Sequence, residues 1–122
     1  MEGLLAEAGA LRFEMDAWWS GFGNPAALRS ALLAAELIVL ADGESGLLTV
    51  ASAGMNWVVA FTSAAEVAHF ARSREANWAT VTVRGQRLLK EVIPASRREL
   101  GVVVDVASGR RMLFPPEPVS AN

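Results

Sequence analysis

The chain has 122 residues, a net charge of −2 and no cysteine, and these properties exclude several classes of protein. The length fits one domain with a sizeable buried core. Because the chain has no cysteine, it cannot form disulfide frameworks, thiolate nucleophiles or cysteine-based metal sites. The charge excludes a generally basic nucleic-acid binder. An acidic start and the lack of a long apolar run predict a cytoplasmic protein without a signal peptide and without a membrane partner.

The first predicted element is a helix over residues 3–20 that carries an apolar stripe. The stripe repeats at spacings of three and four residues, which is the period of one helix face packed against another surface. Its members are Leu4, Ala8, Leu11, Met15, Trp18 and Phe22, with Trp19 beside them. Two interpretations stay open, because such a face is either part of the chain's own core or a contact surface for another protein.

A second helix and three strands are expected next. Asn24 is a typical N-cap residue, and Pro25 fits the first helical position, where its missing N–H costs nothing. Short apolar runs separated by Gly-rich turns predict strands. These strands cover residues 36–41, 47–52 and 57–61, with a turn at 42–46. We expect the three strands to form an antiparallel meander.

The second half of the chain alternates helices and strands. Ser63 and Glu66 form a capping box at the start of a third helix. A short helix opens at Arg84-Gly85 and is expected to end at Pro94. The remaining strands are expected over residues 78–83, 101–106 and 111–114. The order ααβββαβαββ predicts an α+β fold with a mixed, mostly antiparallel sheet of about six strands. We divide the chain into a helical extension, a domain and a disordered tail, over residues 1–23, 24–118 and 119–122.

From Ala26 onward, several stretches of the chain are similar to one family in their order and spacing. The stretches are Leu28–Leu40, Val58–Val67, Val83–Leu89 and Leu100–Val104. They resemble the SseB-like domain, the N-terminal domain of the enhanced-serine-sensitivity protein family. The resemblance implies neither a defined activity nor a residue-level site. Many members carry an Asn-Pro step in the closing hairpin, where this chain has Asp105–Gly109.

No motif in the sequence predicts catalysis, a metal site or a cofactor. His69, the only histidine, lies two positions from Val67 on the predicted third helix, so we expect it on the exposed face. Ser63 already has a capping role. Asp42 and Glu44 flank a glycine in a turn, whose composition explains them better than acid–base chemistry does. We therefore expect no catalytic residue, and we do not expect an enzyme.

Two binding hypotheses remain. The preferred one is a non-enzymatic interaction module that binds itself, as a homodimer, or another protein, without nucleic acid. Its predicted contact residues are Leu4, Leu11, Met15, Trp18, Trp19 and Phe22. Charge asymmetry would orient the contact, since residues 1–61 carry a net −5 (two basic, seven acidic) and residues 62–122 a net +3 (nine basic, six acidic). The alternative is a small-ligand or anion site, in which Arg84 and Arg87 flank the helix start at Gly85. A simpler interpretation gives Gly85 a capping or turn role.

Overall fold

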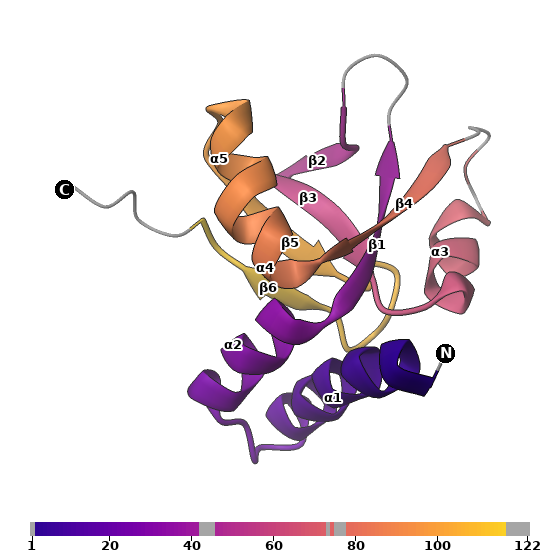
Figure 1. The fold of residues 1–122 in the computed structure, drawn as a ribbon, viewed down its shortest axis with the longest axis vertical. Helices are drawn as coiled ribbons and strands as arrows, with labels where there is room; N and C mark the ends of the chain where they lie inside the picture. The colour runs from indigo at the N-terminus through magenta and orange to yellow at the C-terminus, as the bar shows by residue number, and fades with distance from the viewer. Residues whose placement is uncertain (1, 42–45, 73, 75–77, 117–122) are drawn as a thin grey trace, which may run out of the picture.

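The computed structural model describes residues 2–41, 46–72, 74 and 78–116, and for residues 2–8 it describes the backbone alone. It is an α+β fold with a six-stranded, mostly antiparallel sheet, in the predicted order of elements (Figure 1). The helices are α1 (Glu2–Trp19), α2 (Pro25–Ala34), α3 (Ala64–Ala71), α4 (Gly85–Arg87), the π-helical η1 (Leu88–Val92) and α5 (Ile93–Ser96). The strands are β1 (Glu36–Ala41), β2 (Thr49–Ser52), β3 (Met55–Phe61), β4 (Ala79–Arg84), β5 (Leu100–Val104) and β6 (Met112–Phe114). Residues 42–45 of the predicted turn at 42–46 and the predicted tail at 119–122 lie outside the described residues.

The sheet has the strand order β4-β1-β3-β5-β6, and β2 pairs with β3 beside this path. Only the β3–β5 pair is parallel in the described sheet. The predicted meander is wrong in its strand order, because β3, and not β2, has the central place. One part of β3 pairs with β1, at Ile38↔Phe61, and another pairs with β2, at Thr49↔Val58. Five successive residues of β3, Trp57–Phe61, are buried. Such a run is typical of a strand that lies between two other strands of the sheet.

The predicted caps begin α2 and α3 as expected. Asn24 Oδ1 accepts hydrogen bonds from the backbone N–H groups of Ala26 and Ala27, at 3.0 and 3.1 Å. Ser63 Oγ accepts one from the N–H of Glu66 at 3.3 Å. Each cap satisfies donors that the first helical turn leaves without an intrahelical partner.

The prediction that Pro94 ends the fourth helical segment is wrong. The helix widens into the π-helical η1, where the N–H of Ile93 bonds to the carbonyl of Leu88, and it continues through Pro94 into α5. A locally wider turn is a known way for a helix to change its bonding register. The segment ends at Arg97, which adopts the left-handed conformation with φ 59°.

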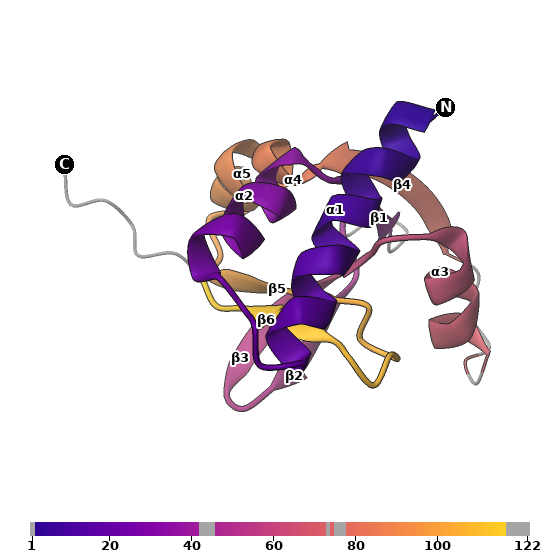
Figure 2. The same cartoon turned by 90° about the horizontal axis from the view of Figure 1, so that it is seen from below.

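The sheet buries apolar side chains on both faces. One face packs against α1, α2 and the η1 segment, and the other packs against α3 through Phe70. The alternation along β5 shows this division, since Val102 and Val104 belong to the first cluster and Val103 to the second. Figure 2 shows α1 and α2 next to one another and α3 set apart from them.

Candidate protein-interaction surface

The stripe on α1 is divided between the core and the surface. Leu11 and Met15 are buried in the same apolar cluster as Leu28 and Leu32 of α2. Their predicted role as partner contacts is therefore corrected, because the chain's own second helix and sheet cover them. The side chain of Leu4, also predicted as a contact, lies outside the described side chains.

The other half of the stripe is exposed at the end of α1. Trp18, Trp19 and Phe22 keep 44%, 52% and 82% of their surface accessible, and we call these three residues the aromatic surface. Isolated exposed apolar residues are ordinary, but three large aromatic side chains within five residues are not. The structure therefore brings together three of the six predicted contact residues.

Local backbone geometry places these aromatic side chains. The helix ends at Trp19, and Gly21 follows with a φ of +89°, the left-handed conformation typical of a residue just past a helix end. The N–H of Phe22 then bonds back to the carbonyl of Ala17 at 2.8 Å, so the chain turns sharply and Phe22 extends from the corner. Trp19 Nε1 donates a hydrogen bond of 3.1 Å to the carbonyl oxygen of Arg111, just before β6.

An apolar groove of about 260 Å³ adjoins Trp18. Its walls come from the end of α1, from α2, from Leu89 of η1 and from β6, and Arg29 is the one charged residue among those that line it. The remaining lining residues are Trp18, Pro25, Leu28, Leu32, Met112, Leu113, Phe114 and Pro115. The sequence did not predict that Leu113 lines this groove with about half of its surface exposed. Alternation around residues 111–114 indicates a strand, but it does not tell which strands lie at the sheet edge.

The predicted anion site has a different role in the structure. The N–H of Gly85 donates to the carbonyl oxygen of Ala35 at 2.8 Å, and a Cβ at this position would overlap the carbonyl of Leu32. Gly85 thus allows α4 to approach α2 closely, so its N–H is not available to an anion. This finding corrects the prediction of an exposed helix start.

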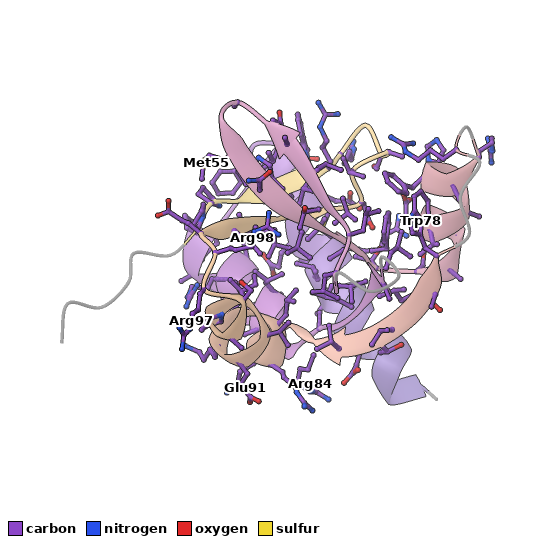
Figure 3. All side chains as sticks on the ribbon, turned by 90° about the horizontal axis from the view of Figure 1, so that it is seen from above. Met55, Trp78, Arg84, Glu91, Arg97 and Arg98 are labelled. Carbon is purple, nitrogen blue, oxygen red and sulfur yellow. The ribbon has the colours of Figure 1, made fainter. Side chains whose placement is uncertain are left out.

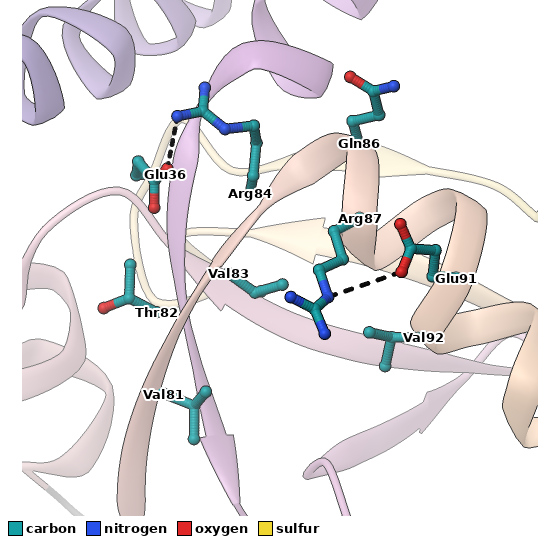
Figure 4. A pocket seen from close by; sticks show the side chains of 9 residues that line it. All are labelled: Glu36, Val81, Thr82, Val83, Arg84, Gln86, Arg87, Glu91 and Val92. Carbon is teal, nitrogen blue, oxygen red and sulfur yellow. Dashed lines mark ion pairs between the residues drawn. The ribbon is translucent and has the colours of Figure 1, made fainter.

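The two arginines of that alternative are paired with carboxylates. Arg84 Nη2 lies 2.8 Å from Glu36 Oε2, and Arg87 Nε lies 3.7 Å from Glu91 Oε1. Both pairs border an open cleft beside β4 (Figure 4). The cleft has a volume of about 700 Å³. Because each arginine has an internal counter-charge, the cleft does not present the uncompensated positive charge that would attract an anion.

A buried polar junction joins the ends of the parallel strands β3 and β5. The sequence alone did not predict it. Asp105 accepts hydrogen bonds from Thr62, at 2.9 Å from the backbone N–H and at 2.8 Å from Oγ1. Both residues are buried. Burial raises the pKa of Asp105 and the Glu66 carboxylate adds to the rise, whereas the bonds from Thr62 and the charge of Arg12 oppose it. His69 is exposed on α3, as predicted.

Comparison with known proteins identifies the family. The family model described as SseB protein N-terminal domain matches residues 16–121. The chain belongs to this family. The match begins within α1, whereas the predicted boundary between extension and domain lies at residues 23/24. No match to the chain was found among curated proteins or among solved structures.

Two further searches of the described residues gave no candidates. None of the helices there is long and apolar enough to span a membrane. In the same part of the chain, no three His, Asp or Glu side chains come together as possible metal ligands.

Proposed function

We propose that this SseB N-terminal domain is a non-enzymatic, cytoplasmic interaction module that forms a homodimer through the aromatic surface. The observation that carries the proposal is the exposure of Trp18, Trp19 and Phe22 within five residues, with Trp18 lining the apolar groove. Tryptophan and other large aromatic residues dominate the binding energy of many protein interfaces. A largely apolar surface suits burial against a partner better than it suits proton transfer.

A second copy is the partner that this surface fits. The same chain carries both a protruding aromatic side chain, Phe22, and a groove beside Trp18 and Leu113 that can receive one. A two-fold axis lets each copy insert Phe22 into the groove of the other, because isologous contacts are reciprocal. The charge of Asp16, two residues before Trp18, is paired, since Arg110 Nη1 lies 3.4 Å from its Oδ1.

Sedimentation velocity over a series of protein concentrations tests the dimer. We expect Phe22→Ala to weaken dimerisation by roughly 10- to 100-fold, because truncating a central aromatic anchor removes most of its contact area. Phe13→Ala is the matched control. Phe13 is also an exposed phenylalanine, but it lies within α1, on the opposite helix face from the buried Leu11 and Met15. A wild-type monomer at every concentration, or equal effects of the two variants, would contradict the proposal.

A further inference from the structure

The strand β4 is an open edge of the sheet. It pairs with β1 over six successive residues, from Glu36↔Arg84 to Ala41↔Ala79, without a bulge. On its other side no strand of the described chain pairs with it. Figure 3 shows β4 at the rim of the molecule, running from Trp78 to Arg84. The outward N–H and C=O groups of such a strand are available to another strand.

Residues that usually protect an edge are missing from the first five positions of β4. All its residues except Val83 are exposed, and Ala79–Val83 contains neither proline nor charge. Its β-branched alternation of Thr and Val is typical of a strand that pairs well. Natural sheets normally protect such an edge with lysine, proline, a bulge or a covering segment. A regular, unprotected edge is therefore more consistent with an interface than with a free surface.

We propose that β4 pairs with β4 of a second copy, in antiparallel register about a two-fold axis at Val81 or Thr82. With the axis at Val81, Thr80 faces Thr82 and Ala79 faces Val83. With the axis at Thr82, Val81 faces Val83 and Thr80 faces Arg84. Neither register places like charges opposite each other, and matched cross-strand pairs stabilise a sheet. This self-complementarity is the reason for choosing a second copy over a different protein.

The side chains beside the strand are compatible with both registers. Figure 4 shows Thr82 and Val83 on opposite sides of β4, with Val83 towards the cleft that Val92 also lines. The charge at the end of the strand is already balanced, since Arg84 is paired with Glu36 of its own chain. An added strand would therefore bury mainly Thr and Val side chains without isolating an unpaired charge.

This interface is separate from the aromatic surface. β4 forms one edge of the sheet, whereas the groove beside the aromatic surface includes β6 at the other edge. Two isologous interfaces on one chain give either a closed tetramer, when the two axes are perpendicular and intersect, or an open assembly. Each interface can consequently be removed without removing the other.

Single-cysteine cross-linking tests the β4 pairing, because the chain has no cysteine of its own. Val81→Cys, Thr82→Cys and the control His69→Cys, an exposed position on α3, are oxidised separately. We expect the cysteine on the axis to form an intermolecular disulfide roughly tenfold faster than the control, since disulfides need Cα atoms within about 7 Å. The neighbouring position should react slowly, because its equivalent in the second copy lies diagonally across the pair. Equal rates for all three variants would overturn the proposal.

Repeating the oxidation with Phe22→Ala separates the two interfaces. We expect the fast β4 cross-link to persist in this background, whatever happens to the aromatic dimer. Hydrogen exchange on the wild-type chain provides a test free of cysteine, in which amides of residues 79–84 should exchange more slowly as the protein concentration rises. Exchange independent of concentration, or loss of the cross-link in Phe22→Ala, would contradict an independent β4 interface.

Discussion

The two halves of the α1 stripe share one helical period but have opposite environments. Leu11 and Met15 are buried in the core, whereas Trp18, Trp19 and Phe22 are exposed and Trp18 lines the groove. The helical period determines which side chains share a face, but what covers that face depends on where α2 and the sheet end. A single stripe therefore contributes both to the core and to the exposed surface of the molecule.

The largest expected effect comes from the buried half. Leu11→Ala should lower the free energy of unfolding by about 2–5 kcal/mol, because it leaves a cavity among residues that are almost fully buried. Urea unfolding followed by tryptophan fluorescence measures the change. If Leu11→Ala unfolds at the same urea concentration as the wild type, α1 does not contribute to the core. The contrast between a buried and an exposed half of the stripe is then wrong.

The exposed half should affect association. Trp18→Ala is expected to cost roughly 2–4 kcal/mol of dimerisation, since Trp18 adjoins the groove and is a natural anchor. The dissociation constant from sedimentation measures this cost, with Phe13→Ala as the control. A dissociation constant unchanged within about twofold would exclude Trp18 as an anchor, because an anchor is worth far more than that.

A substitution at Gly85 tests whether this position serves the packing of α4 against α2 or the binding of an anion. Gly85→Ala should destabilise the fold by about 1–3 kcal/mol, because the added Cβ would overlap the carbonyl of Leu32. Thermal unfolding of the wild type and the variant measures the loss, with and without inorganic phosphate. Stabilisation of the wild type by phosphate, beyond a chloride control of equal ionic strength, would instead support the anion site.

Local patterns predicted most of the local structure, except that the fourth helical segment continues through Pro94, and they failed where distant segments meet. The caps at Asn24 and Ser63 depend on neighbours within three residues, so the sequence shows them directly. The central place of β3, the close approach at Gly85 and the exposure of Leu113 depend on contacts between segments far apart in the chain. The fold class was therefore predictable, whereas the groove was not.

The junction of Asp105 and Thr62 is another contact between distant segments, and it gives the smallest expected effect, a change in pH dependence. The pKa of Asp105 in the folded chain lies above its ordinary value of 3.8, mainly because of burial. As the pH rises from that value through the raised pKa, the carboxylate ionises more readily in the unfolded chain, so the wild type loses stability. Asp105→Asn cannot ionise, yet its side-chain oxygen can still accept the Thr62 N–H bond.

The free energy of unfolding of Asp105→Asn, relative to the wild type, should therefore increase with pH across this window and then level off. Urea unfolding of both chains at a series of pH values measures the difference. A difference that stays constant, or that decreases with pH, would mean that the hydrogen bonds from Thr62 and the charge of Arg12 outweigh the cost of burial. Asp105 would then stabilise the fold as an ordinary paired carboxylate, and α1 would contribute to the junction through Arg12 as well as to the core through Leu11.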